Sequence, residues 1–326
     1  MRAVVQDRYG PPEVLRIEDV AKPVPRDRDV LIRVHASTVC QTDTHVRRAS
    51  VVLYRLFLGI RGPRQRTLGV DLAGVVEAIG PGVTAFKPGD EVFGNVGFDT
   101  GAHAEYVVVP ERGAIARKPV NLTFEEAASI CDGAQQGLAT LRRGRVRKGT
   151  RVVVYGASGS LGTAAVQIAK HWGAHVTAVT STKNVELVRS LGADEVIDRT
   201  HDDLTTRGPV YDVIIDAVGK YAFYWARNAL KRGGVYVETD FGPHKLHTFT
   251  WWFLSRFVGG KHLRFGAGSR RKADVEYLRE LIEAGAYRPV IDSVYPMDQV
   301  VEAHRHVEGW HKVGNVVLLI SPGSRT

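Results

Sequence analysis

The pattern of apolar and polar positions changes character near residue 123. Before that point, short apolar runs alternate with turns rich in glycine and proline, such as Gly80-Pro81-Gly82. Short strands at regular spacing are typical of a β barrel or sandwich. The chain is therefore expected to begin with a β-rich domain, whose clearest strands are residues 1–5, 30–35, 73–79, 91–94 and 104–109.

After residue 123, apolar strands alternate with segments of helical periodicity. Thr123 and Glu126 have the spacing of a capping box, which predicts the start of a helix. Strands that alternate with helices indicate a doubly wound parallel sheet, so the expected fold class is α/β. The predicted strands of this sheet are 152–155, 176–180, 211–216 and 235–238, with helices at 137–143, 163–172 and 184–191; helices at 273–284 and 300–307 and a strand at 315–320 follow.

The most specific motif joins the first strand of that sheet to its helix. Glycines at such a turn let the backbone approach a pyrophosphate, and the helix N-terminus offers N–H groups and partial positive charge. Ala157 stands in the first of the three glycine positions of the dinucleotide fingerprint. The alternative is a purely structural turn. The predicted cofactor-binding residues are Ala157, Ser158, Gly159, Ser160, Leu161 and Gly162.

The segment after the second strand bears on the choice of cofactor. An NAD-preferring site carries an acid roughly 20 residues after the glycines, bonded to the ribose 2′-hydroxyl. Ser181, Thr182 and Lys183 stand there instead, and the first acid is Glu186. Hydroxyls and a lysine suit a 2′-phosphate, which favours NADPH over NADH. A second interpretation, compatible with the first, is that Ser181 and Thr182 cap the next helix.

Composition and charge exclude several classes of protein. The 326 residues are 44% hydrophobic and 24% charged, which is ordinary for a globular protein of two domains. There is no run of about 20 apolar residues, so no membrane partner is expected. The net charge of +9 is dispersed, whereas nucleic-acid binders concentrate basic residues, so no nucleic-acid partner is expected. Two cysteines and an N-terminus without an apolar signal region predict a cytoplasmic protein.

Taken together, the chain resembles the medium-chain dehydrogenase/reductase superfamily over essentially its whole length. The residues that carry the resemblance include 68–76 (LGVDLAGVV), 87–94 (KPGDEVFG), 101–106 (GAHAEY), the glycine turn and 211–219 (YDVIIDAVG). The chain is most similar to the zinc-independent, quinone oxidoreductase-like branch. This resemblance implies a GroES-like β-rich catalytic domain at 1–122 and 263–326, a Rossmann domain at 123–262, and a homodimer. It also adds Ala217 and Val218 to the cofactor site.

The resemblance separates this chain from the zinc alcohol dehydrogenases of the same superfamily. Those enzymes carry a cysteine motif, then Gly-His-Glu, then a later cysteine. The first motif is present from Cys40 to His45, but Val70 replaces the histidine and Asp132 stands at the later position. Cys40, Asp71 and Asp132 would be an unusual ligand set for zinc. No zinc or other metal is therefore expected, and a zinc alcohol dehydrogenase with altered ligands is the alternative.

Reduction without a metal needs another group to polarise or protonate the substrate oxygen. By resemblance, Thr42 and His45 match the hydroxyl and imidazole of a proton relay, and Cys40 also lines the family cleft. These three are the candidate catalytic residues. The alternatives are that His45 binds only backbone or ribose, and that Cys40 is a small buried residue rather than a nucleophile.

Four further residues are candidates for the substrate cleft. Asp132 matches a cleft position of the family, and Trp251 and Trp252 match a loop near the cleft and the dimer edge. Tyr54 could cover the cleft from the other side. For the aromatic residues, packing in the core or against a second subunit is the alternative.

The favoured function is a cytoplasmic NADPH-dependent reductase of a quinone, an α,β-unsaturated carbonyl or an aldehyde. Its partners would be that small molecule and a second copy of the chain. Two other hypotheses stay open: the zinc alcohol dehydrogenase with altered ligands, and a non-catalytic NADPH-binding redox sensor.

Overall fold

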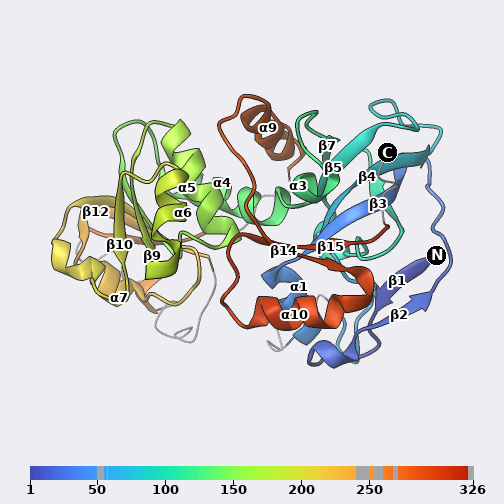
Figure 1. Cartoon of the computed structure of the whole chain (residues 1–326), viewed down its shortest axis with the longest axis horizontal. Coiled ribbons are helices and arrows are strands. Elements are labelled where there is room, and N and C mark those ends of the chain that lie inside the picture. The colour runs from blue at the N-terminus through green and yellow to red at the C-terminus, as the bar shows by residue number, and fades with distance from the viewer. Residues whose placement is uncertain (50–54, 57, 240–249, 253–259, 267–270, 322–326) are drawn as a thin grey trace. The chain divides into compact units, whose positions relative to one another are not determined.

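The computed structural model describes the chain except for residues 50–54, 57, 240–249, 253–259, 267–270 and 322–326. Internal contacts divide it into two units, which are described separately (Figure 1). Unit 1 comprises Met1–Asp132, Arg270–Ala284 and Pro289–Thr326, and unit 2 comprises Gly133–Ser269 and Gly285–Arg288. The domain limits expected from the sequence remain a prediction. The contact boundaries lie ten residues beyond the expected limit at 122 and seven beyond that at 262, and residues 285–288 belong to unit 2.

The described part of unit 1 is built on a mainly antiparallel seven-stranded sheet around one long strand, β3 (Asp29–Val39). β3 pairs along one edge with β4, and along the other with β6 and β15. The order is β14-β15-β3-β4-β5-β7, with only β14 and β15 parallel to each other. The strands are β4 (Asp71–Ile79), β5 (Glu91–Asn95), β6 (Tyr106–Pro110), β7 (Ala114–Arg117), β14 (Ile291–Pro296) and β15 (Asn315–Leu319); β1 (Arg2–Val5) and β2 (Arg16–Asp19) form a separate pair.

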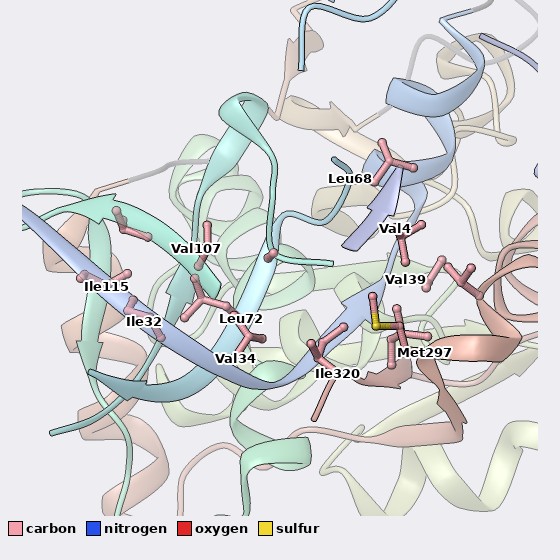
Figure 2. Close-up of a cluster of buried hydrophobic side chains, with 14 of the residues drawn as sticks. Val4, Ile32, Val34, Val39, Leu68, Leu72, Val107, Ile115, Met297 and Ile320 are labelled. Atoms are coloured by element: carbon pink, nitrogen blue, oxygen red, sulfur yellow. The ribbon is translucent and has the colours of Figure 1, made fainter. Parts of the chain in front are cut away.

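Apolar side chains from both ends of the chain form the core of unit 1 (Figure 2). Val4, Ile32, Leu72 and Ile320 all belong to it, and Met297 joins them from the short 3-10 helix Met297–Gln299. Complete burial of such a side chain stabilises the fold by roughly 1.5–3 kcal/mol. Residues 289–320 are therefore an integral part of a domain that the first third of the sequence begins.

Helices in unit 1 pack around this sheet. α1 (Gln41–Arg48) follows β3 directly and contacts α10 (Val300–Glu308), beside which it is drawn in Figure 1. α3 (Phe124–Ala128) begins at the Thr123–Glu126 capping box and contacts β3 and β4, and α9 (Lys272–Glu283) contacts β7. The capping box confirms the predicted helix start.

Unit 2 contains a parallel six-stranded sheet in the described residues, ordered β10-β9-β8-β11-β12-β13. The α/β class and the parallel Rossmann-like sheet predicted from the sequence are confirmed. Its elements are α4 (Cys131–Gly144, which begins in unit 1), β8 (Arg151–Tyr155), α5 (Ser160–His171), β9 (His175–Thr180), α6 (Val185–Ser190), β10 (Glu195–Asp198), β11 (Tyr211–Asp216), α7 (Phe223–Ala226), β12 (Leu230–Glu238) and β13 (His262–Phe265).

Several elements differ from the sequence prediction. α4 begins at Cys131, six residues before the expected helix at 137–143. β13 pairs in parallel with β12, which keeps residues 262–265 in the sheet of unit 2. The pattern missed two helices, α1 and α7, and five strands, β2, β7, β10, β13 and β14. Each is short and has too few apolar positions to establish a period.

Candidate functional site

The turn between β8 and α5 is built for close approach of a ligand. Gly156 has φ of +79°, a conformation that L side chains rarely adopt, and a Cβ on Gly162 would lie 2.2 Å from the Gly156 carbonyl oxygen. A Cβ on Gly159 would meet only that same oxygen, at 3.7 Å, so the position faces open space. The residues of this turn fit a dinucleotide pyrophosphate, because the N–H groups of the first turn of α5 have no acceptor within their own helix.

Ser158 connects this turn to the segment that was predicted to select the cofactor. Its hydroxyl oxygen accepts hydrogen bonds from Thr180 Oγ1 at 3.1 Å and from Asn184 Nδ2 at 3.0 Å. Ser181 lies between these two partners, and Lys183 is exposed beside them. The structure therefore brings the glycine turn and residues 181–183 together at the carboxyl ends of β8 and β9.

The sequence prediction missed an acid at the same edge of the sheet. Asp198 pairs with Thr180 in the register of β10 and β9, which places it beside the 181–183 segment. Hydrogen bonds from the hydroxyls of Thr182 and Thr200 lower the pKa of Asp198 to about 2. Arg199 follows it, and its N–H donates to the Thr180 carbonyl at 2.9 Å. Local sequence spacing gave no signal for this, because the register of parallel strands brings the two segments together.

Ala217 and Val218 follow β11 and reach the same turn. The Ala217 N–H donates to the Tyr155 carbonyl at 2.9 Å, and a Cβ on Gly156 would lie 2.6 Å from Val218 Cγ1. The buried Asp216 carboxylate accepts from the N–H groups of Val218 and Gly219, both at 3.0 Å. Burial raises the pKa of Asp216 to about 6. Asp216 thus fixes the loop that carries two predicted cofactor residues.

In unit 1, Cys40 lies at the end of β3, at the start of α1. Its thiol donates to Asp43 Oδ2 at 3.1 Å, and its N–H donates to the same oxygen at 2.9 Å. Burial raises the pKa of the Cys40 thiol well above its usual value, and the carboxylates of Asp132 and Asp43 raise it further. These surroundings favour a neutral thiol, which closes the first turn of α1, rather than a nucleophilic thiolate.

Thr42 and Asp132, two residues predicted from distant parts of the chain, are in direct contact. Thr42 Oγ1 donates to Asp132 Oδ1 at 3.0 Å, and both residues are half-buried. His45 lies one helical turn after Thr42 on α1 and is also half-buried. Within the described residues its ring has no hydrogen-bond partner. The structure thus brings Cys40, Thr42, His45 and Asp132 into one region of unit 1.

Asp71 is a buried carboxylate directly behind Asp132. Its Oδ2 accepts from Thr38 Oγ1 at 2.8 Å, and its Oδ1 accepts from Asn95 Nδ2 at 2.7 Å. The N–H of Asp132 donates to both oxygens, at 3.1 Å and 3.2 Å. Burial raises the pKa of Asp71 well above its usual value, and the nearby Asp132 carboxylate raises it further.

The chemistry of these donors does not fit the zinc alternative. The Asp71 oxygens already accept hydrogen bonds from Thr38, Asn95 and Asp132. The Cys40 thiol already donates to Asp43. In the part of the chain that the structure describes, no group of three or more histidine, cysteine, aspartate or glutamate side chains could hold a metal ion.

A lysine that the sequence prediction did not identify lies near the same region. Lys312 is half-buried in the segment before β15, and its ammonium donates to the Gly314 carbonyl at 2.5 Å. Burial lowers the pKa of Lys312, whereas the neighbouring Cys40 and Asp132 raise it. β15 pairs Val316 with Val39, the residue before Cys40, which explains this proximity.

The predicted aromatic residues of the cleft have other neighbours in unit 2. The ring centroid of Trp251 lies 5.8 Å from that of Phe223, and that of Trp252 lies 6.4 Å from that of Phe265. Both tryptophans are half-buried against the core of this unit. Tyr54 lies outside the described residues. A role of these three residues at the substrate stays a prediction.

Comparisons with known proteins agree with this geometry. Residues 26–120 match the alcohol dehydrogenase GroES-like domain, and residues 191–318 match a family described as zinc-binding dehydrogenase. The chain is 35% identical to a mitochondrial NAD(P)H oxidoreductase of Mus musculus, over 98% of this chain and 89% of that protein. It is 32% identical to the chloroplastic NADPH-dependent alkenal/one oxidoreductase of Arabidopsis thaliana, over 99% and 80%. The structure of the quinone oxidoreductase from Coxiella burnetii matches with a TM-score of 0.88 and 27% identity, over 98% of this chain and 99% of that one.

The chain belongs to the quinone oxidoreductase-like branch of the medium-chain dehydrogenase/reductase superfamily. As a member of this branch it is an oxidoreductase that uses a nicotinamide cofactor. The resemblance found in the sequence is thereby confirmed. No helix among the described residues has the length and apolar character that crossing a membrane requires.

Proposed function

We propose that this member of the quinone oxidoreductase-like branch is an NADPH-dependent reductase that transfers hydride to a quinone, an α,β-unsaturated carbonyl or an aldehyde without a metal. The observation that carries the proposal is the hydrogen-bonded set of Asp71, Asp132 and Thr42. By the family resemblance, Asp71 and Asp132 match ligand positions of the zinc enzymes, and Thr42 matches the hydroxyl of their proton relay. Quinone and alkenal/one reduction are the activities named for two of the similar proteins, from Coxiella burnetii and Arabidopsis thaliana.

The proposed cofactor site is formed by the carboxyl ends of β8, β9 and β11. The glycine turn would hold the pyrophosphate with the N–H groups of α5. Ser181 and Lys183 would hold the 2′-phosphate, with Arg199 as a second cation. Thr182 lies beside them, and its hydroxyl donates to Asp198, the carboxylate that opposes the phosphate. Two cations against one carboxylate support NADPH over NADH.

The proposed chemistry uses few groups of the protein. A reduced nicotinamide dinucleotide, when bound, supplies the hydride. His45 would deliver the proton that the substrate oxygen requires, and Thr42, whose hydroxyl hydrogen points at Asp132, would accept a hydrogen bond from the next donor of this relay. Their positions, one turn apart on a helix with a rigid start at Cys40, favour this role.

The test is oxidation of NADPH by the purified protein against a panel of quinones, enones, aldehydes and ketones, with and without a chelator. We expect turnover of at least one of the first three classes at a rate that the chelator leaves unchanged. Loss of activity with the chelator, together with about one zinc per chain, would instead support the zinc alcohol dehydrogenase. Binding of NADPH with no turnover on any class would support the redox sensor.

A homodimer and a cytoplasmic location are also proposals. The dimer rests on the family resemblance, and the location rests on the two free cysteines, both of which are buried. The similar protein from Mus musculus is mitochondrial, so the compartment needs its own experiment.

A further inference from the structure

The buried carboxylate of Asp71 lies behind two half-buried residues of the candidate site. Asp71 is 2% exposed, so a substrate has no route to it. Its four hydrogen bonds come from three elements: Thr38 on β3, Asn95 on β5, and the first turn of α4 through Asp132. Two of them come from the Asp132 N–H. Asp132 lies in the first turn of α4, where N–H groups have no acceptor within the helix.

Asp132, whose main chain is held by Asp71, in turn restrains the side chain of Thr42. With the Asp132 main chain held by Asp71, its side-chain oxygen Oδ1 accepts the Thr42 hydroxyl hydrogen at 3.0 Å. A hydroxyl has one hydrogen and two acceptor lone pairs. The hydrogen is thus directed at a carboxylate, and the lone pairs of Thr42 Oγ1 are left to accept from a donor of the proton relay, such as a hydroxyl of the cofactor.

We propose that Asp71 is a positioning residue for the reaction, which acts through Asp132 on the orientation of the Thr42 hydroxyl. The inference rests on the proposed role of Thr42 in the site. The network replaces a metal as the element that fixes the polar geometry of this region. Such fixation matters because displacement of a reacting group by about 1 Å can reduce a rate roughly 100-fold.

A hydrogen bond to the main chain of Asp71 offers a control for the hydrogen bonds of its carboxylate. Ser37 donates to the Asp71 main-chain carbonyl at 2.5 Å rather than to its side chain. Ser37→Ala therefore removes a buried hydrogen bond at the same residue and leaves the four bonds of the carboxylate in place. It is the matched control for Asp71→Asn, which keeps the shape of the side chain but replaces one of the two acceptors with a donor.

The first experiment is a double-mutant cycle between Asp71→Asn and Thr42→Val. We expect Asp71→Asn to lower kcat about tenfold with the KM for substrate and the Kd for NADPH changed less than about twofold, since tenfold corresponds to about 1.4 kcal/mol. In the Thr42→Val background the same change should have less than about a twofold effect, because the group that Asp71 positions is already gone. Multiplicative effects, as a merely structural role would give, would overturn the inference.

Two further comparisons test the path from Asp71 through Asp132 to Thr42. Asp132→Asn keeps an oxygen that can accept the Thr42 hydrogen, so it should retain several-fold more kcat than Asp132→Ala. Ser37→Ala should keep kcat within about twofold of wild type. Equal kcat for the two Asp132 variants, or a tenfold loss in Ser37→Ala, contradicts the proposed path.

The second experiment needs no substrate and so separates this inference from the proposed function. The N–H of Asp132 lies in the first turn of α4 and donates to Asp71. If Asp71 anchors this helix end, Asp71→Asn should speed hydrogen–deuterium exchange of the backbone amides at the start of α4 several-fold, followed by peptide mass spectrometry, and Ser37→Ala should not. An unchanged rate in Asp71→Asn would refute the anchoring step even if the wild-type protein reduces quinones.

Discussion

Single charges at the carboxyl edge of the parallel sheet decide the proposed cofactor preference. Lys183 and Arg199 are exposed there, and Asp198 stays ionised because hydroxyl hydrogen bonds lower its pKa to about 2. A 2′-phosphate would meet both cations, whereas a 2′-hydroxyl needs neither. Asp198 alone would favour a ribose hydroxyl, so the cations must outweigh it for NADPH to be preferred.

Lys183→Ala tests this balance. We expect the Kd for NADPH to rise about tenfold, equivalent to about 1.4 kcal/mol, and the Kd for NADH to change less than about twofold. Fluorescence titration of both cofactors measures the two values. Lys148→Ala is the matched control, because it removes an equal exposed charge just before β8, at the other end of the sheet. Equal weakening of both cofactors would show that Lys183 does not contact a phosphate.

At the residue scale the sequence identified most groups of the candidate site but not their partners. Thr42 and Asp132 were each selected separately, and their mutual hydrogen bond became visible only in the structure. Asp71 was considered only as an altered zinc ligand, because a buried carboxylate with four donors has no signature in local sequence. Lys312 and Arg199 were missed for the same reason: strand register brings them to their neighbours.

At the scale of elements, two glycines of the turn between β8 and α5 are required for different reasons. Gly162 is required by the fold, because a Cβ there would meet the backbone of Gly156 and Ala157 at 2.2 Å and 2.7 Å. Gly159 has φ of −77° and is open toward the proposed pyrophosphate, so only a ligand requires it to be small. Neighbouring glycines of one motif should therefore respond differently to the same substitution.

Gly162→Ala and Gly159→Ala form a matched pair. Gly162→Ala should lower the free energy of unfolding by about 1–3 kcal/mol, as overpacking does, and abolish NADPH binding. Gly159→Ala should keep the stability within about 0.5 kcal/mol of wild type and weaken NADPH binding at least tenfold. Thermal melting and cofactor titration of the apo proteins distinguish these outcomes. Unchanged NADPH affinity in Gly159→Ala would contradict the assignment of the turn.

Elements with a clear apolar pattern were predictable from the sequence, and very short or mostly polar ones were not. The strands at 152–155, 176–180 and 211–216 were placed within a residue of the observed β8, β9 and β11. β10 and α7, of four residues each, were missed because so few positions establish no period. α1 was also missed, since Gln41–Arg48 is mostly polar and packs against α10, a contact with residues far along the sequence.

At the scale of the whole molecule, burial of Asp216 couples stability to pH. Its pKa is raised from 3.8 to about 6 in the folded chain, because burial outweighs four hydrogen bonds from Val218, Gly219, Tyr221 and Tyr236. The folded state therefore binds the proton more tightly than the unfolded state. Its contribution to stability is fully present below about pH 3.8 and is lost as the pH rises through about 6.

Asp216→Asn should remove this dependence. Relative to the variant, the wild-type protein should gain up to about 3 kcal/mol of unfolding free energy between about pH 7 and about pH 4, since each pKa unit is worth about 1.4 kcal/mol. Urea denaturation followed by tryptophan fluorescence measures the difference at each pH. A constant difference between the two proteins over this range would show that Asp216 is ionised throughout.

The position of β15 between β14 and β3 has a consequence for how the chain is made. All six described strands of the parallel sheet lie within residues 151–265, so this sheet can form while the remainder is still being synthesised. The seven-stranded sheet cannot be completed until residue 319 has been synthesised. Until then the last four residues of β3 lack their partner strand β15 on one edge. An uncovered strand edge is a template for aggregation. The unit whose strands begin earlier in this sequence is therefore the later of the two to be completed, and translation through β15 is what protects it.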